Sequence, residues 1–546
     1  MEYEQLRKEF TIEVPEFFNF GHDVIDRLAE TARNRLAMIW VGENGRSRSL
    51  TFRDMKIFSN QVANILSKHD LAPGDRVLLL MPRLPEWWFA VLGLIKRGIV
   101  FVPSAVSLTS KDLEYRCNKG EIKAIITSSA NASKVDAIRD AIPTVEKFFL
   151  VGEPQQGWLD FTAEMAGASR DLVRLGDQSP TRADDPMLIY FTSGTTAHPK
   201  IVMHRHSYAL AHRVTAQLWH DLGPGDIHWT ITDTGWAKTA WGALFGQWLV
   251  GATIFIYDYS GPFVARDILK LLEEHGVTTF CAPPTAYRML ILEDLRHYDL
   301  AELRHCVSAG EPLNPEVIDV WKRGTGLQIY EGYGQTETVV IIATLPGMQV
   351  KPGAMGRPLP PYEVEVLRHD LTLAGIGEEG DVGVKIKPVR PPGIFDGYVD
   401  ADEINAEAFV GDWYLTGDRA YKDEDGYYWF VGRRDDVIKS SGYRIGPFEV
   451  ESALLEHPAV VEAAVIGIPD ELRGQRVKAF VILGGAHEPS DALARELQEH
   501  VRKVTAPYKA PREIEFVREL PKTISGKIRR VELRDAELRK LRGPQG

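Results

Sequence analysis

The sequence predicts an α/β protein with a large N-terminal domain and a small α+β C-terminal domain. The N-terminal domain consists of layered α/β subdomains followed by a small β-rich subdomain. Apolar runs alternate with helical patterns through the first three-quarters of the chain, as in parallel sheets that are buried on both faces. Gly and Pro become frequent after about residue 350. At 546 residues the chain exceeds one ordinary core, so two or more domains are expected.

The first strand–helix–strand run shows this alternation clearly. Residues 77–81 (VLLLM) predict a buried strand, and residues 100–103 (VFVP) predict the next one. Between them, residues 85–97 (PEWWFAVLGLIKR) predict a helix with proline near its first turn. Further apolar runs of the same style are residues 124–127, 148–151, 252–257 and 277–281.

The last third of the chain has a different sequence pattern. Turns such as Lys351-Pro352-Gly353 and Pro391-Pro392-Gly393 separate short strands and predict the β-rich subdomain. The polar segment 432–436 marks the main boundary, so we predict domains 1–434 and 435–546. The second domain is expected to contain a helix over 447–457, a strand over 461–466 and a helix over 491–504.

The net charge and the cysteine content argue against several classes of function. The net charge of −12 argues against general binding to nucleic acid or to a membrane surface. Cys117, Cys281 and Cys306 have no C-x-x-C spacing, which disfavours a disulfide framework and a cysteine-based zinc site. The first residues do not resemble a signal peptide, and every apolar run is far shorter than a transmembrane helix. We therefore expect a cytosolic (cytoplasmic) protein without integral membrane association.

Residues 190–200 (YFTSGTTAHPK) form a loop rich in glycine and hydroxyl groups that is closed by a lysine. Small residues let backbone N–H groups approach phosphate oxygens, and the lysine adds positive charge. The segment is not the G-x4-G-K-[ST] loop, because no glycine directly precedes Lys200 and Ile201 follows it. Taken alone it is also compatible with a surface turn. The candidate phosphate contacts are Thr192, Ser193, Gly194, Thr195, Thr196 and Lys200.

Three further segments carry candidate chemistry. Residues 330–338 (YEGYGQTET) offer rings that can stack on a purine, and Glu337 can hold Mg²⁺; the alternative is a strand-to-helix turn. Residues 414–418 end a predicted strand at Asp418, which suits ribose hydroxyls but also fits an ordinary Gly-Asp turn. Lys527 follows Ser-Gly on a predicted turn, where an exposed lysine is usually only solubilising.

In this order the segments resemble the acyl-adenylate-forming superfamily, which includes acyl-CoA synthetases, luciferase-like enzymes and peptide-synthetase adenylation domains. The resemblance covers nearly the whole chain and is strongest to the medium-chain acyl-CoA synthetase branch. It is carried by Gly332–Glu337, Ser440–Glu449 and Thr505–Lys509. Ala197-His198 depart from the family pattern, because the phosphate loop commonly has glycine after its hydroxyls.

The resemblance implies a ligation in two steps. A carboxylic acid attacks the α-phosphate of ATP, in the presence of Mg²⁺, and gives an acyl-adenylate and pyrophosphate; the thiol of CoA then displaces AMP. Lys527 would bridge the carboxylate and the α-phosphate. Thr192, Lys200 and an Mg²⁺ ion held by Glu337 would bind the outer phosphates. Asp418 would bind ribose, with Arg433 as a donor to ribose or phosphate. The remaining nucleotide contacts would be Gly310, Glu311, Pro312, Glu331, Gly332, Tyr333, Gly334, Gln335 and Thr336.

The second step implies a mobile C-terminal domain. It would swing about a hinge at Asp435, so that Ser440, Ser441 and Gly442 line a tunnel for the pantetheine arm of CoA. Gly442 would be needed because a side chain there would plug the tunnel. Arg444 would steady one orientation, and Arg473 and Lys503 are candidates for binding the CoA phosphates.

The acyl pocket is expected around residues 232–242 (TDTGWAKTAWG), together with Gly310 and Gly334. Trp236 and Trp241 fit pocket lining and core packing equally well, and Lys238 is either a pocket residue or exposed. Two pocket tryptophans would favour medium, branched or cyclic and aromatic acids.

The alternatives are an adenylation enzyme that loads a carrier protein, an oxidoreductase of luciferase type, and a non-catalytic nucleotide-binding protein. The sequence leaves formation of a homo-oligomer open.

Overall fold

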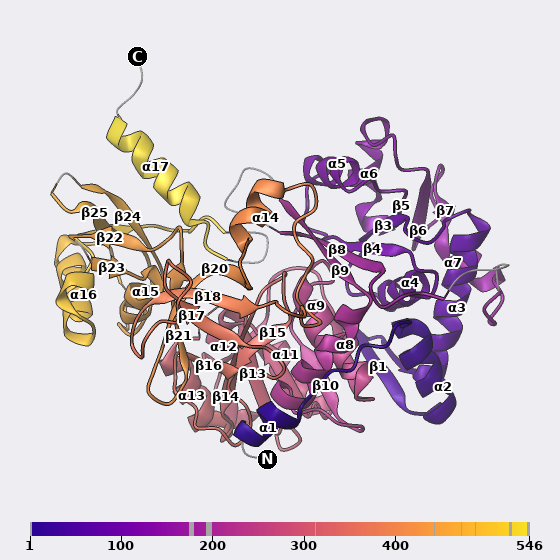
Figure 1. Cartoon of the computed structure of the whole chain (residues 1–546), viewed down its shortest axis with the longest axis horizontal. Coiled ribbons are helices and arrows are strands. Elements are labelled where there is room, and N and C mark those ends of the chain that lie inside the picture. Colours follow the sequence, from indigo (N-terminus) through magenta and orange to yellow (C-terminus); the bar gives the residue numbers. More distant parts are fainter. Residues whose placement is uncertain are drawn as a thin grey trace.

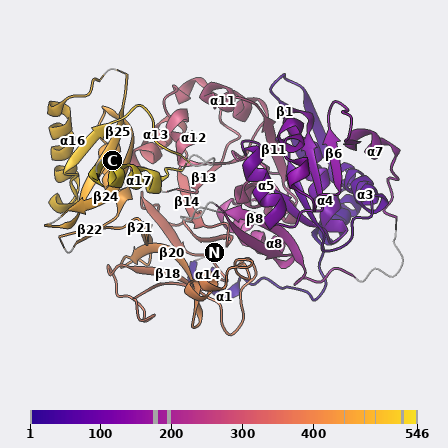
Figure 2. The same cartoon turned by 90° about the horizontal axis from the view of Figure 1, so that it is seen from above.

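The protein is described by a computed structural model that covers residues 3–173, 180–192, 199–311, 313–441, 443–470, 472–485, 487–522 and 527–542. Three sheets follow one another along the longest axis, the first at one end and the C-terminal sheet at the other (Figures 1 and 2). This arrangement confirms the predicted fold class. The helices outside the C-terminal part are α1 (Tyr3–Glu9), α2 (Arg27–Thr31), α3 (Phe52–Lys68), α4 (Pro85–Lys96), α5 (Ser110–Lys119), α6 (Ala132–Asp136), α7 (Phe161–Gly167), α8 (Ser207–Val214), α9 (Ala237–Gly242), α10 (Phe245–Leu249), α11 (Ala265–Glu274), α12 (Pro284–Leu290), α13 (Pro315–Thr325) and α14 (Asp402–Ala408).

The first sheet has the order β7-β6-β5-β3-β4-β8-β9, parallel except for the β8–β9 pair. Alternate residues of β3 serve opposite faces: Val77 and Leu79 join the core that contains α3 and α4, whereas Leu78 and Leu80 pack with α5. Burial on both faces explains why its strands are almost continuously apolar. Its strands are β3 (Arg76–Leu80), β4 (Val100–Pro103), β5 (Ala124–Ser128), β6 (Lys147–Val151), β7 (Leu159–Asp160), β8 (Pro186–Thr192) and β9 (Lys200–Arg205).

The second sheet runs through the middle of the molecule, in the order β17-β18-β20-β21-β16-β15-β14-β13-β12-β10-β11-β1-β2. The stretch from β14 through β13, β12, β10 and β11 to β1 is parallel. Parallel strands bring their carboxyl ends to one edge, where sites form in α/β sheets. The strands of this sheet that precede residue 350 are β1 (Leu36–Gly42), β2 (Ser47–Thr51), β10 (Ile227–Thr230), β11 (Thr253–Asp258), β12 (Thr279–Ala282), β13 (His305–Ala309), β14 (Ile329–Gly334) and β15 (Val340–Ala343).

The predicted β-rich segment continues this sheet through antiparallel pairs of β15 with β16 and of β16 with β21. Its strands are β16 (Ala354–Pro358), β17 (Val364–Leu367), β18 (Gly380–Lys385), β19 (Phe409–Val410), β20 (Trp413–Lys422) and β21 (Tyr428–Arg433). One prediction is corrected here. Asp418 lies in the middle of β20, paired with Arg433 of β21, and does not end a strand.

A second local expectation is also corrected. The alternative for residues 330–338 was a turn into a helix, but β14 turns directly into the antiparallel strand β15, with Gly334 opposite Val340. The glycines of this segment leave room for close backbone approach: a Cβ on Gly334 would lie 2.3 Å from the carbonyl oxygen of Val339.

The third sheet holds the C-terminal part, in the order β23-β22-β25-β24, with β26 parallel to β25. The helix predicted over 491–504 has those bounds, and the helix predicted over 447–457 ends at Leu455. The elements are β22 (Ile438–Ser440), β23 (Tyr443–Ile445), β24 (Val460–Asp470), β25 (Gly474–Leu483), β26 (Glu513–Phe516), α15 (Pro447–Leu455), α16 (Asp491–Val504) and α17 (Arg530–Arg542). The boundary between residues 434 and 435 stays a prediction.

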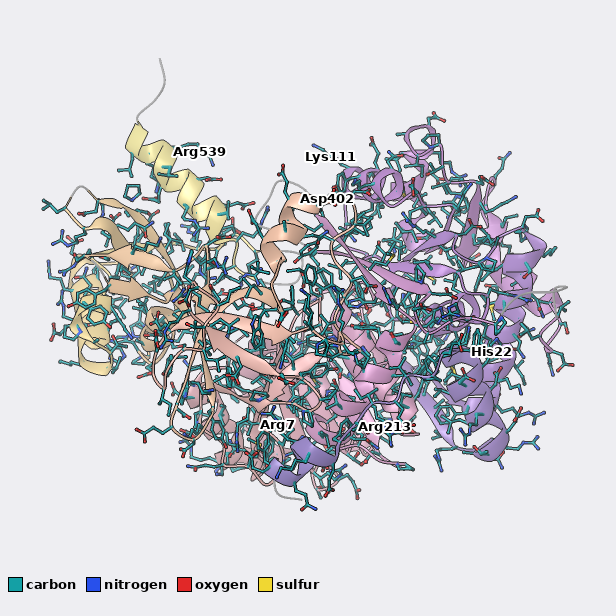
Figure 3. The ribbon with its side chains drawn as sticks, viewed as in Figure 1. Arg7, His22, Lys111, Arg213, Asp402 and Arg539 are labelled. Atoms are coloured by element: carbon teal, nitrogen blue, oxygen red, sulfur yellow. The ribbon has the colours of Figure 1, made fainter. Side chains whose placement is uncertain are left out.

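The exposed charged residues and the free cysteines agree with what the composition predicts. Lys111, Asp402 and Arg539, which are labelled in Figure 3, are exposed charged residues. The three cysteines are buried and free. Within the described ranges we find no helix whose length and apolar character would let it cross a membrane.

Candidate functional site

The ends of the predicted phosphate loop are held side by side at the β8–β9 edge. Thr192 ends β8 and is paired with Lys200 at the start of β9. The Nζ of Lys200 lies 4.8 Å from the ring centroid of Tyr398, whose hydroxyl donates a 2.8 Å hydrogen bond to Glu337. Residues 193–198, which include Ser193, Gly194, Thr195 and Thr196, lie outside the described residues.

The turn that carries Glu337 is fixed from several sides. The backbone N–H of Gln335 donates to the hydroxyl of Thr338 at 2.9 Å. His204 Nε2 donates to the carbonyl oxygen of Thr336 at 2.7 Å. Burial lowers the pKa of His204 to about 4, so the imidazole is neutral near pH 7 and Nε2 carries the proton that it donates. The carboxylate of Glu337 therefore stands on a rigid turn beside Tyr398 and Lys200.

Asp418 is a buried carboxylate at the centre of a polar cluster. It accepts hydrogen bonds from the hydroxyl of Tyr333 and from Gln335 Nε2, both at 2.6 Å, and from Arg433 at 3.1 Å. The Asp418 charge is the largest cause of the raised pKa of Arg433. Tyr414 donates to the amide oxygen of Gln335 at 2.9 Å and so fixes that amide. Because these donors hold the Asp418 side chain in place, its carboxyl oxygens can accept further bonds from ligand hydroxyls.

Three residues of the predicted nucleotide set follow the end of β13, and one of them lies outside the described residues. Gly310 has a φ of +111°, a backbone conformation that favours glycine, and Glu311 follows it. Pro312 is not among the described residues. The carbonyl oxygen of Ala309 accepts a 2.6 Å hydrogen bond from the Nζ of Lys238, which comes from α9.

Glu331, which is predicted to contact the nucleotide, bonds to two backbone N–H groups in this structure. Its two carboxyl oxygens accept hydrogen bonds from the backbone N–H groups of Leu313 (3.0 Å) and Gly353 (3.3 Å). Burial raises its pKa to about 8, despite those bonds. The side chain therefore ties two neighbouring segments to β14, because both of its oxygens face backbone donors.

Lys238 lies at this edge, beside Gly310. Burial lowers the pKa of Lys238, and the charge of Lys527 lowers it further. Lys527 is exposed and lies three residues before the start of α17. Its positive charge thus acts on Lys238, whose Nζ lies beside Gly310.

The two tryptophans of the predicted acyl pocket have different surroundings. Trp236 precedes α9 and packs, partly buried, against the apolar cluster of the first sheet. Trp241 is 6% exposed and belongs to the largest core cluster. Its carbonyl oxygen accepts a 3.0 Å bond from Gln247 Nε2.

The predicted CoA residues lie on the third sheet. Ser440 of β22 pairs with Gly474 of β25, and the N–H of Ser441 donates to the carbonyl oxygen of Arg473 at 2.9 Å. The φ of Ser441 is +52°, which marks a tight local turn. Lys503 is exposed in the last turn of α16. Gly442 and the side chain of Arg444 are not among the described parts.

The predicted hinge is contacted by α17. Asp435 is exposed, and its carbonyl oxygen accepts a 3.0 Å hydrogen bond from Arg534. Arg534 also pairs with Asp436 at 2.9 Å. Arg530 forms an ion pair with the buried Glu451 at 2.7 Å. Burial lowers the pKa of Arg530, but Glu451, then Asp436 and Glu311, raise it above its usual value.

Sequence reasoning missed several residues of this arrangement. Tyr398 and His204 stand in no motif, and their roles depend on contacts across long sequence separations. Arg530 had a weak signal, since it follows Lys527 by three residues in the segment SGKIRR.

Comparisons with known proteins agree with this geometry. The family model described as AMP-binding enzyme matches residues 25–399, and the model of the AMP-binding enzyme C-terminal domain matches residues 449–527. The chain is 45% identical to acyl-coenzyme A synthetase ACSM3, mitochondrial, of Mus musculus, over 98% of this chain and 93% of that protein. It is 47% identical to acyl-coenzyme A synthetase ACSM5, mitochondrial, of Homo sapiens, over 96% and 91%.

Solved structures give the same result. The anthranilate CoA ligase AuaEII in complex with anthranoyl-AMP is 32% identical with a TM-score of 0.87, covering 96% of this chain and 98% of that one. An acyl-CoA synthetase of Brucella canis is 35% identical with a TM-score of 0.75, covering 99% of both. A benzoate CoA ligase from Burkholderia xenovorans LB400 is 28% identical with a TM-score of 0.82, covering 95% and 100%. The chain therefore belongs to the AMP-binding enzyme family and is an AMP-forming acid–CoA ligase, an acyl-CoA synthetase.

Proposed function

We propose that this acyl-CoA synthetase activates a medium-chain, branched or aromatic carboxylic acid, and that Lys527 and Lys238 stand at the two sides of its reacting carboxylate. The observation that carries the proposal is the position of Lys238, whose Nζ lies beside Gly310 and donates to the carbonyl oxygen of Ala309 at the carboxyl end of β13. The positive charge of Lys527 also acts on the pKa of Lys238. A buried cation is costly unless an anion joins it. A carboxylate and a phosphate are the anions that this reaction brings together.

The first half-reaction joins two anions, so positive charge must offset their repulsion. Lys527 neutralises the attacking carboxylate and the α-phosphate, and Lys200 neutralises the outer phosphates. Arg433 and Asp418 hold the ribose, since a fixed acceptor and a fixed donor lie together there.

Magnesium fits the donor set beside the phosphate loop. The carboxylate of Glu337 and the hydroxyl of Thr192 are the hard oxygen ligands that this ion prefers. Mg²⁺ would neutralise phosphate charge there. The chain's own contribution is the position of Glu337, fixed by the Tyr398 hydroxyl at 2.8 Å.

The second half-reaction requires another part of the chain at the same place. Ser440 and Ser441, with Arg473 beside them, would enter after rotation about Asp435 and guide the pantetheine arm. Arg444, Arg473 and Lys503 are the cations proposed for the orientation change and for the CoA phosphates.

The relatives support the proposed size of the acid. Two structural relatives are named as ligases of anthranilate and benzoate, both of which are compact aromatic acids. Trp236 directly precedes α9 and Trp241 lies within it, which agrees with a pocket of limited depth. A medium-chain or branched acid occupies a similar volume.

For the compartment we propose a reducing one, because all three cysteines are buried and free. The expectation of a cytosolic protein stays a prediction. The names of the curated relatives include the word mitochondrial, so cell fractionation with markers for both compartments separates the two locations.

The test is AMP release from ATP over linear acids from acetate to decanoate, 2-methylbutyrate, benzoate and cyclohexanecarboxylate, with and without CoA. We expect CoA-dependent turnover on the compact acids. Adenylate formation that CoA does not stimulate would point to a carrier-protein acceptor. Turnover restricted to acetate would contradict the proposed acid class.

A further inference from the structure

Lys200 and Glu337 carry opposite charges, and both contact the side chain of Tyr398. The Nζ of Lys200 lies 4.8 Å from the ring centroid of Tyr398, and the hydroxyl of this tyrosine donates a 2.8 Å hydrogen bond to Oε1 of Glu337. Neither charged group forms an ion pair with any residue in the described part of the chain. One tyrosine is therefore the shared neighbour of a cation and an anion that do not pair with each other.

The separation of Lys200 from Glu337 needs a physical cause. The four-carbon stem of lysine is flexible, and the attraction between two opposite charges grows as the distance between them falls. A direct bond between Lys200 and Glu337 would offset both charges. The lysine would then be less available to phosphate oxygens, and the carboxylate would be less available to a divalent cation.

The backbone of Tyr398 is attached to β9, the strand that begins at Lys200. Tyr398 forms an antiparallel bridge with Val202 of β9. Both of its backbone groups bond to the side chain of Asn405: the N–H donates to Oδ1 and the carbonyl oxygen accepts from Nδ2, each at 2.7 Å. The ring is thus held next to Lys200 by contacts that do not involve the lysine itself.

The same segment is bonded to the turn that carries Glu337. The N–H of Phe395 donates to the carbonyl oxygen of Glu337 at 2.9 Å, and the rings of Phe395 and Tyr398 lie 4.9 Å apart. Phe395 is buried. Burial raises the pKa of Tyr398, and the charge of Glu337 raises it further, so the hydroxyl keeps its proton and remains a hydrogen-bond donor.

A tyrosine suits both neighbours because it carries no charge at neutral pH. Its ring face attracts an ammonium group without cancelling the ammonium charge. Its hydroxyl satisfies one oxygen of Glu337 as a neutral donor, and the other oxygen, Oε2, accepts no hydrogen bond from a described residue. Lys200 and Glu337 thus each have a stabilising neighbour and keep their full charge.

We propose that Tyr398 is a positioning residue that prevents an ion pair between Lys200 and Glu337, so that Mg·ATP meets both charges uncompensated. The inference rests on the proposed function, in which Lys200 binds the outer phosphates and Glu337 the magnesium ion, and it adds the residue that keeps the two apart. The nucleotide then binds without first breaking an ion pair. In the absence of the tyrosine side chain, that ion pair competes with the nucleotide.

The first measurement is the crystal structure of Tyr398→Ala without nucleotide, compared with those of the wild type and of Tyr398→Phe. In Tyr398→Ala we expect the Nζ of Lys200 within about 4 Å of the Glu337 carboxylate, which is the distance of an ion pair. Phenylalanine keeps the ring face, so the two groups should stay apart in Tyr398→Phe. A folded Tyr398→Ala in which they also stay apart overturns the proposal.

The second measurement is the Kd of Mg·ATP by calorimetry, which does not depend on turnover. Tyr398→Ala should bind Mg·ATP about three- to tenfold more weakly than the wild type, because the ion pair must break first. The loss should be smaller in Tyr398→Phe. KM for ATP should rise with Kd while kcat changes less than about twofold, since the bound nucleotide has already separated the two charges. Tyr421→Ala is the control and should keep the wild-type Kd, because Tyr421 stacks on Trp429 instead.

The outcomes separate this inference from the proposed function. If Lys200→Met and Glu337→Gln leave the Kd of Mg·ATP unchanged, the proposed phosphate and magnesium roles are wrong. If both weaken binding while Tyr398→Ala binds as tightly as Tyr398→Phe, only the role of Tyr398 is overturned. Thermal melting establishes which variants are folded. If alanine unfolds the segment, Tyr398→Leu replaces it, because leucine fills space beside Phe395 but offers no ring face; the ion pair and weaker binding are again expected.

Discussion

Asp418 shows at the scale of one residue why a motif needs its surroundings. The Gly-Asp pair alone fits an ordinary turn, but the structure buries this carboxylate among the Tyr333 hydroxyl, the Gln335 amide and the Arg433 guanidinium. All of these donors lie far from Asp418 or on a neighbouring strand. The proposed ribose role depends on that cluster, because its donors hold the carboxyl group in place.

Removing the Asp418 charge should weaken ATP binding. In Asp418→Asn the side chain carries no charge, so the hydrogen bonds that it accepts become weaker. In addition, the new amide N–H₂ group lies against other hydrogen-bond donors. We expect KM for ATP to rise about 10- to 100-fold, since one or two charged hydrogen bonds are weakened. Asp402→Asn, on the exposed helix α14, is the matched control and should keep the wild-type KM. An unchanged KM in Asp418→Asn would remove this residue from the nucleotide site.

Glu331 should make the stability of the protein depend on pH. Its pKa is raised to about 8 by burial, whereas an unfolded chain ionises this carboxyl near pH 4.3. Between these values the folded state binds one more proton than the unfolded state. The contribution of Glu331 to stability is therefore lost as pH rises from about 5 to 8, by up to about 1.4 kcal/mol per pH unit.

The measurement is the melting temperature of the wild type and of Glu331→Gln from pH 5 to pH 8. Glutamine does not titrate, so the wild type should lose stability relative to this variant as pH increases. Glu424→Gln, in an exposed turn, should keep the wild-type pH dependence. Parallel curves for the wild type and Glu331→Gln would contradict the raised pKa.

At the scale of elements, α17 ties the segment after Lys527 to the hinge region. Arg530 and Arg534 extend from its first two turns to Glu451, Asp436 and the backbone of Asp435. Glu451 is buried, and it also accepts a 2.8 Å bond from the N–H of Val465. A buried carboxylate without its arginine is strongly destabilising.

Arg530→Ala should therefore destabilise the C-terminal part by about 3 kcal/mol, because Glu451 loses its counter-ion. The variant should also slow adenylate formation more than thioester formation from a preformed adenylate, since Lys527 is no longer anchored by the same helix. Arg530→Lys should recover part of both losses. Equal slowing of the two half-reactions would show that the helix only stabilises the fold.

Elements with strong local patterns were predictable from the sequence. The strand at 100–103 and the helices that begin at Pro85 and Asp491 have the expected bounds to within a residue, because apolar runs and caps are local signals. Strand pairing was not predictable. The position of Asp418 within β20 depends on pairing with β21, which no local pattern encodes.

The candidate site was predictable only where residues stand in motifs. Lys527, Glu337 and Asp418 belong to the segments that carry the family resemblance. Tyr398 and His204 act through contacts with residues that are 61 and 132 positions away along the chain. Sequence position does not encode such contacts, and a single sequence offers no other signal for them.

At the scale of the whole molecule, the two half-reactions should be separable by mutation. Lys527→Ala should abolish adenylate formation, by at least about a hundredfold, because the charge between carboxylate and α-phosphate is removed. A preformed acyl-adenylate should still react with CoA. Pyrophosphate exchange measures the first step and thioester formation the second; equal loss in both would refute the role of Lys527.

Gly442→Leu should have the opposite effect, because a side chain would plug the proposed pantetheine tunnel. Adenylate formation should remain near the wild-type rate while thioester formation is lost. Survival of CoA transfer in this variant would contradict the predicted tunnel.

The third sheet and α17 carry the groups that we propose for both half-reactions. Lys527 precedes α17, whose Leu533 packs with Ile466 and Ile468 of β24, whereas Ser440 ends β22, on the other side of β25. The two ends cannot occupy one reaction centre at the same moment. In steady-state terms the enzyme should follow a ping-pong order: pyrophosphate leaves before the thiol reacts, and double-reciprocal plots of ATP against CoA are parallel lines.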